Sequence, residues 1–157
     1  MQMKRWTMAL ALCVVSAAAL AADLAAAERA ADKMADAFLA RNYQAIVALT
    51  HPTVVKVAGG PDATAKKIEQ ANAELTYTSM KFGKPQQISD VGSALVGIFP
   101  YHSNITYRKQ ALEVNSFFIG ISTDKRTWKF IDCEGVTQPY LAQLIPGYQN
   151  NLELKGC

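Results

Sequence analysis

The sequence predicts an α+β fold, in which three helical segments come first and four antiparallel strands follow. In the first half of the chain, apolar residues recur at spacings of three and four, as in helices that bury one face. From residue 75 to residue 133 the pattern is extended and rich in β-branched and aromatic residues. Because the two kinds of element occupy separate parts of the chain, we expect the helices to pack on one face of a curved antiparallel sheet.

The helices are expected at 23–41, 43–50 and 61–74, with a short strand or extended link at 54–57. The first helix carries an apolar stripe formed by Ala27, Ala31, Met34 and Phe38. Pro52 ends the second helix by pushing His51 towards an extended conformation. Pro61 suits the first position of the third helix, where its missing N–H costs nothing.

The strands are expected at 75–88 (with a bend at 83–85), 93–101, 105–122 and 127–133. The polar segment Thr123 to Arg126 has the length and composition of a hairpin turn between the last two strands. Side chains alternate along a strand, so Trp128, Phe130 and Asp132 share one face of the last strand. The tail from residue 136 contains apolar residues at helical spacing, and we expect it to cap one end of the core.

Residues 1–21 resemble a signal peptide. Lys4 and Arg5 precede an uncharged run, 8–20, and Ala19 and Ala21 form a small-x-small cleavage site. The run is short for a bilayer span, which needs about 20 residues. We therefore expect one domain, 22–157, in a periplasmic or secreted protein with no integral membrane segment after cleavage.

Charge argues against nucleic acid as a partner. The chain has 16 Lys and Arg against 13 Asp and Glu, and two of the basic residues, Lys4 and Arg5, belong to the leader. The mature domain is therefore nearly neutral, whereas a nucleic-acid partner calls for a clustered basic face.

Two cysteines, Cys133 and Cys157, remain after cleavage, in a compartment where disulfides persist. We predict that they form a disulfide that closes a loop of about 25 residues and stabilises the fold by about 3 kcal/mol. The alternative is a frayed C-terminus with a free or mixed thiol at Cys157.

Two segments, ADAFLARNYQAIVALTHPTVV at 35–55 and TWKFIDCEG at 127–135, resemble the nuclear-transport-factor-two-like superfamily, also described as cystatin-like α+β. The resemblance implies a sheet wrapped into a cone whose open end holds a pocket. Members include isomerases, dehydratases, polyketide-cyclase-like enzymes and non-enzymatic binding or dimerising modules, so fold alone does not settle function. The tyrosine and acidic base of a steroid-isomerase-like member are missing, because the corresponding regions offer Met34, Phe38 and a valine-rich segment at 54–57.

Within such a cone, the expected pocket residues are Trp128, Phe130, Phe118, Tyr77 and Tyr101. Asp132 is the main candidate for a general acid or base, because desolvation beside aromatic rings raises the pKa of a carboxyl group. His51 and Tyr43 are the candidate partners in proton transfer. The alternative for Asp132 is a strand-end carboxylate that accepts backbone N–H groups near Gly135, and for His51 a cap on the last carbonyls of the preceding helix.

No metal or cofactor is expected. Two distant histidines and two cysteines committed to a disulfide do not supply the three or four ligands of a metal site. The sequence contains no Gly-x-Gly-x-x-Gly, phosphate-binding loop or Gly-x-Ser-x-Gly elbow.

These observations favour an exported, non-catalytic accessory module that binds a small apolar ligand or a protein partner. One alternative is a small isomerase, dehydratase or cyclase that uses acid–base catalysis in the cone. Another is a structural homodimer that uses the outer face of the sheet as its interface.

The disulfide is tested by titrating thiols in the mature protein under denaturing conditions. We expect no free thiol before reduction and two after it, because the leader removes Cys13. Two free thiols before reduction would rule out the bridge.

Overall fold

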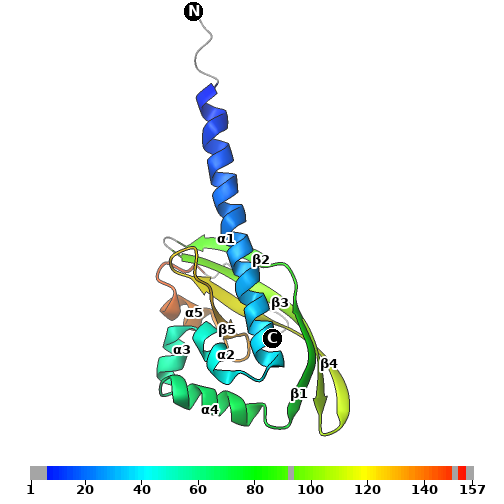
Figure 1. Cartoon of the computed structure of the whole chain (residues 1–157). Helices are drawn as coiled ribbons and strands as arrows, with labels where there is room; N and C mark the ends of the chain where they lie inside the picture. The colour runs from blue at the N-terminus through cyan, green and yellow to red at the C-terminus, as the bar shows by residue number, and fades with distance from the viewer. Residues whose placement is uncertain (1–6, 92–93, 150–151, 155–157) are drawn as a thin grey trace, which may run out of the picture.

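The computed structural model describes residues 7–91, 94–149 and 152–154, with side chains from residue 23 onward. Helices and strands form separate layers, as predicted (Figure 1). The described helices are α1 (Thr7–Leu39), α2 (Tyr43–Leu49), α3 (Pro52–Val57), α4 (Pro61–Ala71) and α5 (Gln138–Leu144). The described strands are β1 (Leu75–Phe82), β2 (Gln86–Val91), β3 (Ala94–Tyr107), β4 (Gln110–Ser122) and β5 (Lys129–Asp132).

The strands form one antiparallel sheet in the order β1-β3-β4-β5, and β2 pairs with the other end of β3, next to β1. The predicted strand 75–88 is therefore two strands, separated at the predicted bend, where the Gly83 N–H donates to the Pro100 carbonyl at 2.8 Å. The predicted turn after β4 is confirmed. The carboxylate of Asp124 accepts the backbone N–H groups of Thr127 and Arg126, and these bonds hold its pKa well below the usual range.

The hairpin between β3 and β4 differs from the prediction. We expected strands at 93–101 and 105–122, but β3 continues to Tyr107 and turns at Arg108 and Lys109. Both turn residues have positive φ, 47° and 70°, as a two-residue hairpin turn requires. Asn-Gly is the usual sequence for such a turn, so the pair Arg108-Lys109 did not indicate a turn. The polar residues 102–104 instead led us to end the strand too early.

The segment 54–57 was expected to be extended, and that prediction is wrong, because it belongs to α3. The run of valines favours strand by propensity. The residues that begin the helix outweigh this strand propensity. His51 is extended (ψ 132°) and its imidazole Nδ1 accepts the N–H of Thr53 at 3.3 Å, while Pro52 provides the first helical residue.

Alternate residues of β3 build two cores, one on each face of the sheet. Val96 and Ile98 point to the face covered by α5 and the tail, where Leu141 is fully buried. Leu95 and Phe99 point to the opposite face, which α1 covers. The tail therefore packs on the core as predicted, but it covers one face of the sheet and not one end of the core.

The helix α1 packs on the sheet through small residues. Ala27, Ala31 and Met34 are buried to 1% exposure or less, and the alanine methyls let the helix axis approach the strands closely. The N-terminal part of α1, in blue, continues beyond the sheet and projects away from the domain (Figure 1). In the part of the chain that the structure describes, no helix is long and apolar enough to cross a membrane.

Replacing two buried serines in the sheet is expected to change stability in opposite directions. Ser103 Oγ is buried and has no hydrogen-bond partner among the described residues, whereas Ser122 Oγ donates to Asp124 at 3.2 Å. We expect Ser103→Ala to raise the free energy of unfolding by about 1 kcal/mol and Ser122→Ala to lower it by about 1 kcal/mol. Urea denaturation of both variants measures the difference, and destabilisation by Ser103→Ala would show that its hydroxyl has a partner.

Candidate functional site

The interior of the predicted cone is filled by aromatic side chains. Trp128 and Phe130 are 2% and 1% exposed, and Phe118 is 6% exposed. The ring of Phe99 contacts both Trp128 and Phe130 edge-on, with centroid separations of 5.3 and 5.1 Å. Three of the five predicted pocket residues therefore belong to the hydrophobic core beneath α1.

The other two predicted pocket residues, Tyr77 and Tyr101, are half-buried beside this core. Tyr77 packs on Phe38 with a centroid separation of 5.2 Å, and Tyr101 packs on Phe118 at 5.4 Å. Each ring thus has one apolar side in the core and a hydroxyl nearer the surface.

Tyr77 and Tyr101 both have raised pKa values. For Tyr77 burial is the largest cause, and the charges of Tyr101, Asp132 and Tyr43 add to it in that order, so that together they raise its pKa to about 12. Burial and the Asp132 carboxylate also raise the pKa of Tyr101. These two hydroxyls stay protonated at neutral pH, so they act as hydrogen-bond donors and not as bases.

Hydrogen bonds tie this tyrosine cluster (Tyr43, Tyr77 and Tyr101) to the helical layer. The guanidinium of Arg41 donates to the Tyr43 hydroxyl at 3.1 Å and to the Asn72 carbonyl at 3.2 Å. The Tyr77 hydroxyl donates to Asn72 Oδ1 at 3.2 Å. Two of the hydroxyls are therefore already engaged by protein groups.

Asp132 lies on the same face as Phe130 but is exposed at the end of β5. Its Oδ1 accepts the backbone N–H of Glu134 at 3.1 Å. This is the strand-end role given above as the alternative to catalysis.

His51 is buried, and burial lowers the pKa of its imidazole. It caps the start of α3 with Nδ1, and its backbone N–H donates to the Phe130 carbonyl at 2.9 Å. The expected cap on the carbonyls of the preceding helix is therefore wrong. Within the described residues, His51 and Asp132 share no hydrogen bond.

The predicted disulfide involves one residue that the structure describes and one that it does not. Cys133 is buried, with Sγ 3.4 Å from Ser116 Oγ. Cys157 lies outside the described residues, so the pairing stays a prediction.

Metal ligands do not cluster in the described part of the chain. No group of three or more His, Cys, Asp or Glu side chains there could hold a metal ion.

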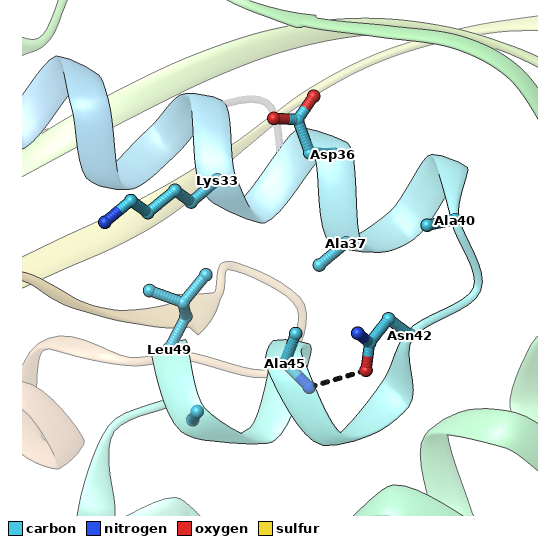
Figure 2. A pocket seen from close by; sticks show the side chains of 8 residues that line it. Lys33, Asp36, Ala37, Ala40, Asn42, Ala45 and Leu49 are labelled. Carbon is cyan, nitrogen blue, oxygen red and sulfur yellow. Dashed lines mark hydrogen bonds between the residues drawn. The ribbon is translucent and has the colours of Figure 1, made fainter.

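Two grooves that the sequence did not predict flank α2. The alanine groove, of about 430 Å³, separates α2 from the end of α1, and its described lining is Lys33, Asp36, Ala37, Ala40, Asn42, Ala45, Ala48 and Leu49. Figure 2 shows the methyl groups of Ala37 and Ala45 facing this space, while the Asp36 carboxylate points away from α2. The Asn42 Oδ1 accepts the Ala45 N–H at 3.1 Å, so this oxygen is already engaged by the protein (Figure 2).

The lysine groove, of about 590 Å³, lies on the other side of α2. Its described lining is Gln44, Val47, Ala48, Thr50, Pro52, Val55, Lys56, Gly60, Pro61 and Lys129. The walls come from α2, α3, the start of α4 and the first residue of β5. Segments so distant in the sequence meet only after folding, so no local motif could have indicated this groove.

Comparisons with known proteins return a weak structural match. No protein-family model matches the sequence, and no curated protein matches it. Among solved structures, the chain is similar to a structure titled "Structure of an M.tuberculosis LEH-like epoxide hydrolase", with 17% identity and a TM-score of 0.37. The match covers 78% of this chain and 98% of that chain. Nothing about activity is carried over from that protein.

The raised pKa of Tyr77 predicts a loss of stability at alkaline pH. The unfolded chain releases this proton near pH 10 and the folded chain near pH 12, so the free energy of unfolding falls as pH rises through this window and is unaffected below it. One such group contributes a slope of at most about 1.4 kcal/mol per pH unit, and less here because the ring is partly exposed to solvent.

We therefore expect Tyr77→Phe to flatten the decline in the free energy of unfolding between pH 10 and pH 12, measured by urea denaturation. Tyr140→Phe, on α5, is the matched control. Equal slopes for the wild type and Tyr77→Phe would contradict the raised pKa.

Proposed function

We propose that the chain is an exported, non-catalytic binding module whose ligand is held on the helical side of the domain, outside the cone. The single observation that carries this proposal is the packed interior. Trp128, Phe99 and Phe130 are each at most 2% exposed, and the ring of Phe99 contacts the rings of the other two. A substrate would have to displace these rings, and truncating one buried Phe or Trp typically costs about 3–5 kcal/mol.

The polar groups support the same proposal. Acid–base catalysis needs a donor and an acceptor whose pKa values lie near the working pH. Tyr77 is far from that range, with a pKa of about 12, and Asp132 is exposed to water at the end of β5. Buried His51 is committed through Nδ1 to the start of α3.

Export is supported by the leader pattern and by the shape of α1. Packing of α1 against the domain involves side chains from Asp23 onward, which are partly buried, and Ala27 is fully buried. A cut after Ala21 would remove the projecting part of the helix and leave these contacts in place (Figure 1). The destination would be the periplasm or the exterior.

A second candidate function is a small acid–base enzyme. It is favoured by one observation, that the Asp132 carboxylate is among the causes that raise the pKa values of Tyr77 and Tyr101. In that case the reaction would take place at the surface beside the tyrosine cluster and not inside the cone.

Native mass spectrometry of protein purified from its own host tests the proposal. We expect a chain that begins at Ala22 and carries a non-covalently bound small molecule. When this molecule is isolated and incubated again with the protein, we expect to recover it unchanged. The same spectrum reports whether the chain is a monomer or a homodimer.

Conversion of the recovered molecule by wild-type protein, with loss of conversion in Asp132→Asn, would overturn the non-catalytic proposal in favour of the enzyme. A recovered chain that still contains residues 1–21 would overturn cleavage of the leader.

A further inference from the structure

We infer that the lysine groove binds a long-chain carboxylate of the fatty-acid class, with the hydrocarbon chain on the groove floor and the carboxylate beside Lys56 and Lys129. This inference rests on the proposed function, because it assigns a site and a ligand class to the binding module. The groove volume of about 590 Å³ lies within the range of about 300–1,000 Å³ that small-molecule sites occupy.

The floor of the groove is hydrocarbon. Val47 is buried and Val55 half-buried, and Ala48, Pro52 and Pro61 add further apolar atoms. When a ligand's methylene groups move from water onto an apolar surface of this kind, the binding free energy improves by about 0.8 kcal/mol for each one fully buried. An alkyl chain therefore suits the floor.

The charge at the groove is positive. Lys129 Nζ donates to the carbonyl of Ala48 in the last turn of α2, which holds the ammonium at the groove and leaves it two further donors. Lys56 adds a second ammonium from α3. No Asp or Glu is among the described lining residues, and Asp62 only adjoins the groove, next to Pro61.

Neither lysine is neutralised by a partner within the described residues. The two ion pairs found there lie elsewhere, between Arg108 and Glu74 and between Lys125 and Asp90. An anionic group on the ligand would complement the charge of the two lysines. The contacts between their ammonium groups and a ligand carboxylate would be charge-assisted hydrogen bonds.

The backbone of the groove walls argues against a peptide. The Val47 carbonyl accepts the Thr50 N–H at 3.0 Å, and the Val55 carbonyl accepts the Gly60 N–H at 2.9 Å. The Gly60 carbonyl in turn accepts the Thr64 N–H at 3.0 Å. A peptide in the groove would find few main-chain partners for its own N–H and C=O groups, and each such group buried without one costs about 1–3 kcal/mol. An alkyl chain has no such groups.

The alanine groove is a weaker candidate. Its wall is mainly a row of methyl groups, and its two charged residues, Lys33 and Asp36, have opposite sign. It therefore offers no net charge to select a ligand.

Isothermal titration calorimetry of the mature protein with sodium dodecanoate tests the inference. We expect saturable binding at one site. Dodecan-1-ol, which has the same chain length but lacks the charge, should bind at least about tenfold more weakly if the ammonium contacts supply roughly the energy of one charge-assisted hydrogen bond.

Substitutions in the groove locate the site. We expect Lys56→Gln and Lys129→Gln each to weaken dodecanoate binding about fivefold or more, and Val55→Asp to abolish it. Lys66→Gln is the matched control, because Lys66 is exposed on α4 and does not line the groove. Lys56→Gln breaks no hydrogen bond found in the described residues, so it remains informative if Lys129→Gln lowers the melting temperature.

Three outcomes would overturn the inference. They are the absence of saturable binding, binding that is unchanged in all three groove variants, and tighter binding of an apolar peptide with a free C-terminal carboxylate than of dodecanoate. If dodecanoate fails to bind while the protein from its own host retains another molecule unchanged, the assignment of the groove falls and the binding function stands.

Discussion

Phe99 lies over Gly120, and this close approach is the constraint on which the rest of the structure depends. A Cβ atom at Gly120 would stand 2.2 Å from Phe99 Cε2, so only glycine leaves room for the ring on the neighbouring strand. From that position Phe99 meets Trp128 and Phe130 edge-on, under the alanine face of α1. The contacts that hold the helical layer on the sheet are the same contacts that fill the cone, and for this reason the proposed binding site lies on the outer surface of the helices.

The sequence revealed the fold where periodicity acts over many residues. The change from helical to alternating patterning near residue 75 separates the layers as predicted, and strict alternation in β5 places Phe130 on one face and Ile131 on the other. The failures have local causes. The turn at Arg108 and Lys109 adopts positive φ without glycine or asparagine, and α3 forms against the strand propensity of its valines.

The candidate site was predictable only in part. The sequence identified the residues of the tyrosine cluster and Asp132, and the Asp132 carboxylate is one of the causes that raise the pKa of Tyr77. It did not show that the aromatic rings behind them would close the interior, because side-chain packing depends on contacts between segments far apart in the chain. The lysine groove is a clearer case, since Lys129 and the Ala48 carbonyl that it caps are 81 residues apart.

The unbroken course of α1, from the predicted leader into the domain, has a consequence for the proposed cleavage. Cleavage after Ala21 would cut through a helix and create a new helical end whose first turn contains Asp23. A carboxylate in that position interacts favourably with the positive end of the helix dipole, whereas the first turn of the uncut helix has no acidic residue. Processing would thus replace a long helix that has no acidic residue in its first turn by a shorter helix that has one. The alanine face of this shorter helix would remain packed on the sheet.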